Sequence, residues 1–406
     1  MSGVRVIDLA NADAPALVPV RAPAAEPARQ PLRLVHVGIH SNLNGNAGDT
    51  LLFRVVRDLV EHVAGPVAWE RRQVWEALDA DEAAALGARS DGVIVGGGGL
   101  LLRDQAGSDT ARSGWQWNAS IDAVRALTVP LAIFAIGYNR FRDQPDFAPP
   151  FAEHLAAVAE RATLLGLRNS GSIAAVRSYL PAHLQDRPRL LHCPTTVLAQ
   201  VYGLRGAPRG DQPVLGVNFA LDRPERRFGG RGERQDRALS RYAAAVAAVQ
   251  QRGWRVRVLR HKELDAPAER HLDAAGVTYE TYDLSSTTPE GVVAGYQGLD
   301  VVAGMRGHGQ LVPFGLRIPI VSVVSHDKLA WFLDDLGHPE WGVELGADDV
   351  SERLVAAIDA AATDARRAEV ERLQARVWEQ TLTTVRDVVS RLRAAATARA
   401  GGPARR

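Results

Sequence analysis

The residues whose types and spacing best suit chemistry are Arg306 and His308, which lie in a turn with Gly304, Gly307 and Gly309. A short apolar run precedes this turn, and a second apolar segment follows it. A strand that ends in such a turn and restarts as a helix leaves free backbone N–H groups and a positive dipole end. Arg306 adds a planar donor fork that fits a carboxylate or phosphate, and His308 can transfer a proton near neutral pH. The pattern therefore predicts an anion site with an acid/base beside it.

A second polar loop spans residues 41–49 and includes Asn44, Asn46, Gly48 and Asp49. Three asparagines and an aspartate in nine residues exceed what a turn needs, which favours recognition of substrate hydroxyls. The alternative is a tight turn in which Asp49 or Thr50 only caps the helix that follows. Both interpretations stay open, with Asp49 as a candidate base and as a candidate cap.

Four consecutive glycines, including Gly97 and Gly98, follow the apolar run 92–95. They do not match the Gly-x-Gly-x-x-Gly fingerprint, and the chain has no Walker motif, so nicotinamide cofactors and P-loop NTP chemistry lose support. Close backbone packing is the simpler explanation, and contact with an acceptor is the functional one. No metal site is expected, because the Asp-x-Asp at residues 79–81 lies in a charged helical segment.

Two further cations stand at predicted strand ends. Arg168 ends one strand, and Lys328 lies in the first turn of a helix whose dipole it opposes. A surface position is the ordinary explanation for each, but a strand end at a cleft favours anion binding. Among 48 lysines and arginines only Lys262 and Lys328 are lysines, which makes both more informative.

Short apolar strands alternate with helical segments along most of the chain, which predicts α/β architecture with parallel sheets. We expect two Rossmann-like domains facing a central cleft, with the glycine loops beyond the carboxyl ends of the strands. The expected divisions are a disordered Ala/Pro-rich leader, an N-terminal acceptor-side domain, a C-terminal domain with the donor anion site, and a helical segment with a basic tail: 1–31, 32–203, 204–349 and 350–406. The last segment either crosses back onto the first lobe or pairs with another copy of the chain.

Composition restricts the partners. A formal net charge of +1 argues against nucleic acid, and the single cysteine, Cys193, excludes an internal disulfide framework and a Cys-rich metal site. No run approaches the ~20 apolar residues needed to cross a bilayer, and no signal pattern opens the chain. We expect a cytoplasmic protein that binds small molecules.

An ordered set of motifs between about residues 33 and 340 resembles the polysaccharide pyruvyl transferase family: Asn46-Ala47-Gly48-Asp49-Thr50-Leu51-Leu52, Ile94-Val95-Gly96-Gly97-Gly98-Gly99-Leu100, Gly166-Leu167-Arg168, Met305-Arg306-Gly307-His308 and Asp327-Lys328-Leu329. The resemblance implies a fold similar to GT-B glycosyltransferases. It also implies phosphoenolpyruvate as co-substrate, with no other cofactor, and a pyruvate ketal formed on a sugar with release of phosphate.

Site roles follow from the resemblance. The donor-binding and catalytic groups would fall on Arg168, Arg306 and His308, with Gly307, Gly309 and Lys328 beside them. His308, held as an imidazolium by the donor anion, would protonate the methylene carbon, and Arg306 would stabilise the departing phosphate. Asn44, Asn46, Gly48, Asp49, Gly97 and Gly98 would face the acceptor. Glycine replaces the family's usual leucine at 307 and alanine or similar at 309, so we expect a looser turn, and Asn169 replaces a common aspartate.

Two other functions compete. A nucleotide-sugar-dependent GT-B glycosyltransferase shares the expected architecture and would use the strand-end cations to hold a diphosphate. A protein that only binds a glycan would need no Arg/His pair, which disfavours it.

Overall fold

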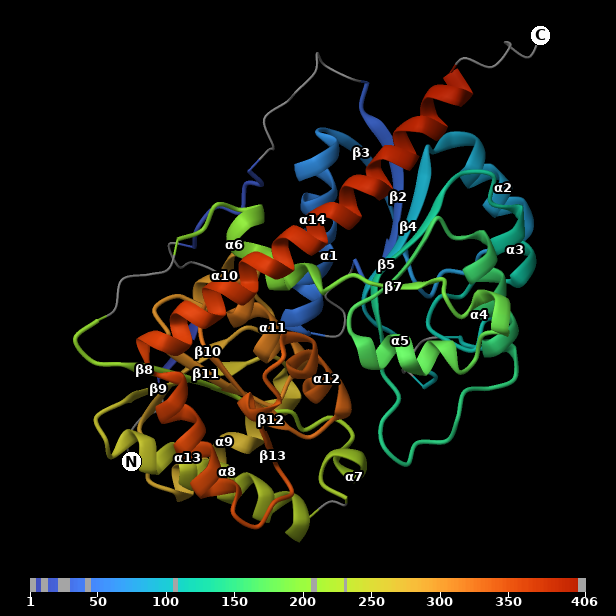
Figure 1. The fold of residues 1–406 in the computed structure, drawn as a ribbon. Coiled ribbons are helices and arrows are strands. Elements are labelled where there is room, and N and C mark those ends of the chain that lie inside the picture. Colours follow the sequence, from blue (N-terminus) through green and yellow to red (C-terminus); the bar gives the residue numbers. More distant parts are fainter. Residues whose placement is uncertain are drawn as a thin grey trace.

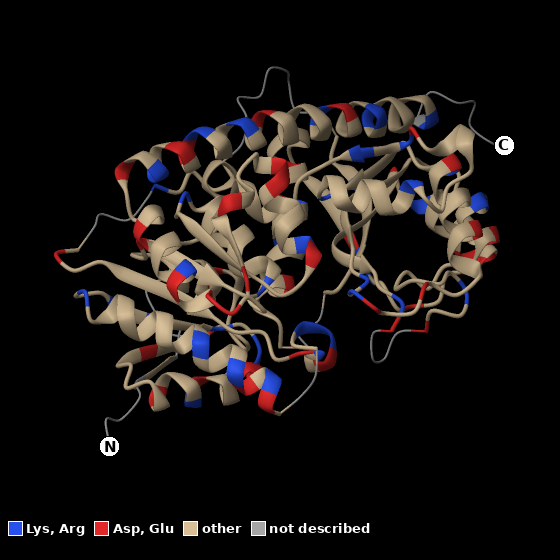
Figure 2. Ribbon diagram, turned by 60° about the horizontal axis from the view of Figure 1, so that its bottom comes forward, with Lys and Arg blue, Asp and Glu red and all other residues tan. Residues whose placement is uncertain are grey.

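The computed structural model describes residues 5–8, 14–20, 30–40, 45–104, 109–205, 210–229 and 232–400. Two parallel β-sheets form the centres of two lobes, and one long helix runs along both (Figure 1). Lys and Arg residues alternate with Asp and Glu residues along the ribbon of both lobes, in keeping with the near-zero net charge (Figure 2). The α/β class and the two Rossmann-like domains are therefore confirmed.

The first sheet has the order β3-β2-β4-β5-β6-β7, and all its strands are parallel. Leu34 and Ile94 point to the face covered by α1, whereas Val35 and Val93 point to the face covered by α2, α3 and α4. Both faces are buried, which explains the nearly continuous apolar strands. The elements are β2 (Leu32–Gly38), α1 (Ala47–Ala64), β3 (Val67–Gln73), α2 (Ala80–Arg89), β4 (Gly92–Leu101), α3 (Ile121–Ala126), β5 (Leu131–Tyr138), α4 (Pro150–Arg161), β6 (Leu164–Leu167), α5 (Ser170–Arg177) and β7 (Pro188–Leu190).

The second sheet has the order β1-β10-β9-β8-β11-β12-β13 and is also parallel throughout. Short helix α6 (Leu198–Val201) lies in the connection between the sheets. The elements are β1 (Arg5–Asp8), β8 (Val214–Asn218), α7 (Pro224–Arg227), α8 (Glu233–Gln250), β9 (Arg255–Arg260), α9 (Glu269–Ala274), β10 (Tyr279–Asp283), α10 (Pro289–Tyr296), β11 (Val301–Gly304), α11 (Gly307–Gly315), β12 (Ile320–Val324), α12 (Asp327–Leu336), β13 (Gly342–Glu344) and α13 (Val350–Ala361).

Each sheet has a point where the strand order reverses. In the first sheet the chain leaves β2 for β3 on one side and returns to β4 on the other. In the second sheet it leaves β8 for β9 and later returns to β11. Loops at such a switch point diverge, so a crevice opens beyond the carboxyl ends of the strands. The two crevices are where the fold predicts ligands.

The expectation of a disordered leader is wrong for its described residues. Residues 5–8 form β1, which pairs in parallel with β10 at the edge of the second sheet. Further along, Leu17 is buried, and the backbone N–H of Val20 donates to the carbonyl of Val201 at 2.7 Å. Prolines exclude a helix here but permit an extended segment at a sheet edge or over a surface. Residues 1–4, 9–13 and 21–29 lie outside the described part.

Helix α14 (Asp364–Ala400) crosses from the second lobe back onto the first (Figure 1). It packs against α1, and its Leu392 fits so closely over Gly92 that a Cβ there would lie 2.1 Å from the leucine side chain. Arg393 Nη2 also donates to the carbonyl of Ala64 at 2.8 Å. The C-terminal helical segment therefore crosses back onto the first lobe, which was the first of the two expected arrangements. None of the helices in the described ranges is both long and apolar enough to cross a bilayer.

Candidate functional site

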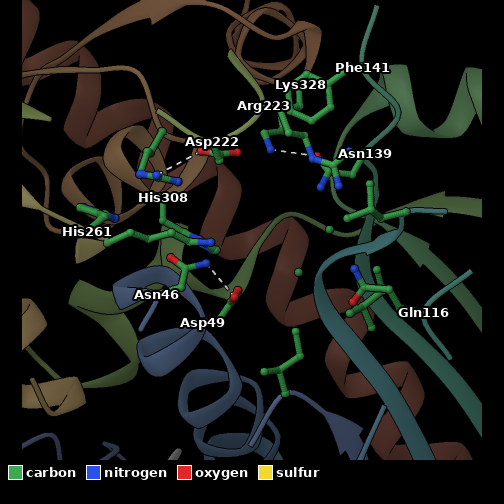
Figure 3. Close-up of a pocket in the computed structure, with 18 of the residues that line it drawn as sticks. Asn46, Asp49, Gln116, Asn139, Phe141, Asp222, Arg223, His261, His308 and Lys328 are labelled. Atoms are coloured by element: carbon green, nitrogen blue, oxygen red, sulfur yellow. Dashed lines mark hydrogen bonds and ion pairs between the residues drawn. The ribbon is translucent and has the colours of Figure 1, made fainter. Parts of the chain in front are cut away.

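A cavity lies between the lobes, beyond the carboxyl ends of both sheets (Figure 3). Segments after β2, β4, β5 and β6 line it from the first lobe, and segments after β8, β9, β11 and β12 line it from the second. The charged groups come from both sides: Asp49 and Arg168 from the first lobe, and Asp222, Arg223, Arg227, Lys262, Arg306 and Lys328 from the second. The cavity thus joins the two switch points and most of the predicted site residues.

The turn at Arg306 is fastened by Asn218, which ends β8. The Asn218 side-chain oxygen accepts hydrogen bonds from the backbone N–H groups of Met305, at 3.1 Å, and Arg306, at 3.0 Å. A Cβ on Gly304 or Gly309 would lie 2.5 or 2.3 Å from the Asn218 amide nitrogen. These glycines therefore make room for the asparagine. The expectation of a looser turn is therefore wrong, because the Asn218 side chain holds the turn in place. Gly309 packs against Asn218 and does not line the cavity.

The guanidinium of Arg306 is held by two carboxylates. Its Nε and Nη2 donate to Asp265 at 2.7 and 2.5 Å, and Nη2 also lies 3.0 Å from an oxygen of Asp222. Burial works against the charge, but Asp265 and Asp222 outweigh it and raise the pKa of Arg306. Arg306 lines the cavity as predicted, but most of its donor fork is already occupied.

His308 lies where the two lobes meet. A Cβ on Gly48, in the first turn of α1, would lie 2.0 Å from His308 Nδ1, so glycine at 48 is what admits the ring. Its Nε2 lies 3.8 Å from the sulfur of Cys193. Burial, followed by the charges of Arg168 and Lys328, lowers the pKa of His308 to about 3. The His308 ring is therefore neutral at neutral pH in the absence of a bound anion. Gly48 makes room for this ring and does not line the cavity.

Arg168 is a buried cation that has no ion-pair partner among the described residues. Its side chain is buried beside Gly137, where a Cβ would lie 2.1 Å from Arg168 Nε. Within the described ranges, its guanidinium makes no hydrogen bond or ion pair. Burial lowers the pKa of Arg168, and the positions of Cys193 and Asp49 only partly offset this. A buried cation that faces a cavity and has no direct ion-pair partner is suited to bind an anionic ligand.

Both lysines of the chain line the same cavity. Lys328 Nζ donates to the side-chain oxygen of Asn139 at 2.8 Å (Figure 3). Burial, with the charge of Arg168, lowers the pKa of Lys328 well below its ordinary value. Lys262 follows β9 and has no side-chain partner among the residues that the structure describes. In a chain that otherwise uses arginine, two ammonium groups in one cavity indicate a requirement for a compact point charge.

Asp49 is not the cap of its helix. Helix α1 begins at Ala47, earlier than expected, and Asn46 caps it by accepting from the Gly48 N–H at 3.2 Å. The Asn46 amide also donates to Asp49 at 2.7 Å (Figure 3). Burial raises the pKa of Asp49, although Lys262 and Asn46 act in the opposite direction. A carboxylate with a raised pKa at a cavity is suited to accept a proton. Asn44 lies outside the described residues.

The four glycines at 96–99 belong to β4, which continues to Leu101 where we expected it to stop at Val95. A Cβ on Gly97 would lie 3.0 Å from Leu52 of α1, so this glycine allows close helix–sheet packing and does not line the cavity. Gly98 does line it, with a left-handed φ of 86° that favours glycine. The packing interpretation thus holds for Gly97, and only Gly98 of the pair is placed to meet a ligand.

Sequence reasoning did not place four residues in the site: Lys262, which it noted only as one of the two lysines, and Asn218, Asp222 and Asp265, which arrange the cations. Three of them follow the ends of β8 and β9, so the rule that ligands lie beyond strand ends would have found them. Nothing in the sequence marks Asp265 as the partner of Arg306, because the two are 41 residues apart and meet only through the fold.

A family model described as polysaccharide pyruvyl transferase matches residues 22–327, well over half of the chain. No curated protein sequence matches it. Similar solved structures include UDP-GlcNAc 2-epimerase from Methanocaldococcus jannaschii, at 8% identity over 82% of this chain and 94% of that one, with a TM-score of 0.48. A glycosyltransferase from Rickettsia africae ESF-5 has 7% identity over 90% and 99%, with a TM-score of 0.49. Since both scores lie below 0.5, the fold assignment rests on the strand orders.

Proposed function

The chain belongs to the polysaccharide pyruvyl transferase family, and from that premise we propose that it transfers the pyruvyl group of phosphoenolpyruvate to sugar hydroxyls as a ketal, releasing phosphate. The single observation that carries this proposal is a cavity whose cations, Arg168 and Lys262, have no counter-charge bound to them among the described residues. Phosphoenolpyruvate supplies a carboxylate and a phosphate, which match such groups in charge and hydrogen bonding.

Arg306 contributes in a different way from Arg168. Asp265 and Asp222 engage its Nε and Nη2, so they fix the plane of the guanidinium. No described residue bonds to Nη1, which is left for the donor. Preorganised donors of this kind stabilise developing charge without reorganising during the reaction. We assign Arg306 to the departing phosphate and Arg168 to the charge of the bound donor.

Proton transfer in the proposed reaction starts at His308. The donor anion raises the pKa of His308 from its low value, and the protonated ring gives its proton to the methylene carbon, leaving a cationic centre at C2. A first acceptor hydroxyl bonds to C2 as Asp49 takes its proton. A second hydroxyl then bonds to C2 as the C2–O bond to phosphate breaks, and neutral His308 takes that proton. The products are the ketal and inorganic phosphate.

Thermal protection tests the donor. Phosphoenolpyruvate at about 100 times its dissociation constant should stabilise the wild-type protein by roughly 2.7 kcal/mol, whereas UDP and GDP should not. The Arg168→Gln variant should fold and lose most of this protection, because glutamine keeps a polar side chain without the charge. Protection by a nucleoside diphosphate and none by phosphoenolpyruvate would instead favour a nucleotide-sugar glycosyltransferase.

A further inference from the structure

A second cavity adjoins the first on the side of the first lobe, with a volume of about 250 Å³. The two cavities share Ile39, Asn46 and Asp49, so they are neighbouring compartments with the Asp49 carboxylate at their boundary. The far wall of the second cavity carries Arg57 from α1 and Arg71 from β3. A molecule bound there would extend from these arginines toward the proposed base.

Neither Arg57 nor Arg71 forms an ion pair with a described carboxylate. The only side-chain hydrogen bond of Arg57 within the described ranges is to Nδ1 of His40, at 3.3 Å. Burial lowers the pKa of His40 to about 4, so the ring is neutral and its Nδ1 can accept from Arg57. Arg71 has no hydrogen bond or ion pair in the same part of the chain. Burial, and then the charge of Arg71, lowers the pKa of Arg57, although Asp58, which is paired with Arg54, acts in the opposite direction.

Three other arginines on or near this cavity wall are paired with carboxylates. Arg54, on the same cavity wall, lies 2.6 Å from Asp58. Arg72, next to Arg71 in β3, lies 3.0 Å from Glu82, and Arg89 lies 2.8 Å from Glu70. Arg57 is half-buried and Arg71 is exposed, so Arg57 is the charge that would normally be paired. With Arg71 lining the same cavity, it indicates that a ligand supplies the missing charge.

We propose that the second cavity binds a phosphate group of the acceptor, so that the acceptor is a sugar phosphate or a sugar diphosphate whose hydroxyls reach Asp49. Two guanidinium groups match the charge and the oxygen geometry of a phosphate ester better than those of a single carboxylate. The side chain of Phe53 also lines this cavity and offers an apolar surface to the sugar ring. Assigning this ligand as the acceptor rests on the proposed function, whereas binding of the phosphate does not.

Calorimetric titration of the full chain tests this site. The probes are glucose 1-phosphate for the monoester, inorganic pyrophosphate for the diphosphate, and glucose as the neutral reference. All variants carry Arg168→Gln, which removes the uncompensated cation of the first cavity. Into this background we would introduce Arg57→Gln with Arg71→Gln. The matched control is Arg112→Gln with Arg125→Gln, which removes two exposed arginines that have no carboxylate partner among the described residues.

The expected result is at least a tenfold weaker affinity for one of the two phosphate probes in the Arg57/Arg71 variant, and no change in the control. The probe that responds identifies the monoester or the diphosphate, and glucose should bind equally to every variant. Equal affinities of the two double variants for both phosphate probes would overturn the proposal, as would phosphate binding that disappears in the Arg168→Gln background alone. Phosphoenolpyruvate titrated into protein with an intact Arg168 tests the donor separately, because a failure there leaves the second site unaffected.

Discussion

At the scale of single residues, the charge state of His308 depends on what occupies the cavity. Burial, followed by the charges of Arg168 and Lys328, lowers the pKa of His308 to about 3 and keeps the ring neutral. An anionic donor would reverse this balance, because an anion beside an imidazole favours its protonated form. The same neighbours that disfavour the imidazolium are thus the groups that would bind the donor. Protonation of the acid would be coupled to substrate binding.

Proton uptake on donor binding tests this coupling. Because the pKa of His308 would be higher in the complex than in the free protein, phosphoenolpyruvate should bind more tightly as the pH falls toward the pKa of the complex. Titration calorimetry at pH 7 in buffers of different ionisation enthalpy should detect uptake of part of a proton. The His308→Gln variant should show a smaller uptake, and an unchanged value would remove His308 from the acid role.

The sequence predicted which candidate residues meet at one cavity better than it predicted the partners of each. Arg168, His308, Asp49 and Lys328 come together as predicted, because strand ends of parallel sheets gather at one edge. Arg306 also lines the cavity, but its pairing with Asp265 made Arg168 the better candidate for the free cation. Such pairing depends on long-range contacts, which residue types and spacing do not contain.

At the scale of elements, the strand–turn–helix at Arg306 depends on an asparagine in another strand. The Asn218 side chain accepts from the Arg306 N–H, and it accepts from the Met305 N–H in addition to the Asn218 carbonyl, which lies 3.4 Å from the Met305 nitrogen. The sequence predicted β11 and the helix after it from apolar runs and glycines. The sequence did not predict why residue 309 is a glycine, because the group that leaves no room for a side chain there is the Asn218 amide, which belongs to β8.

A pair of glycine substitutions tests this arrangement. Gly309→Ala would place a Cβ 2.3 Å from Asn218 and should displace it, costing about 1–3 kcal/mol for each buried N–H left without a partner. At Gly307 the nearest atom is Lys328 Cε, at 3.7 Å, so Gly307→Ala should stay within about 0.5 kcal/mol of the wild type. Urea unfolding measures both free energies. Equal stabilities would show that Asn218 is not under steric constraint.

At the scale of the whole molecule, two sheets with separate switch points share one cavity, and α14 spans both lobes (Figure 1). The alternation of strands and helices was sufficient to predict the two domains. The added edge strand β1 was not predictable in the same way, because four residues pair there only after β10 is in place. The route of α14 likewise depends on the glycine at 92, which a sequence pattern alone does not connect to Leu392.

Removing the contact between α14 and the first lobe should lower the stability of the protein. Leu392→Ala deletes a buried side chain that packs over Gly92, and such changes cost about 2–5 kcal/mol. The neighbouring Arg391→Ala removes an exposed side chain paired with Asp387, and should cost less than about 1 kcal/mol. Guanidinium unfolding followed by tryptophan fluorescence compares the two. Similar midpoints for both variants would contradict a structural role for this crossing.

A crystal structure of the protein with phosphoenolpyruvate tests the central claim most directly. We predict that the donor occupies the cavity between the lobes, with an anionic oxygen within hydrogen-bond distance of the Arg168 guanidinium and its methylene carbon facing the ring of His308. A donor bound elsewhere, or bound in the cavity with its methylene carbon turned away from His308, would contradict the account.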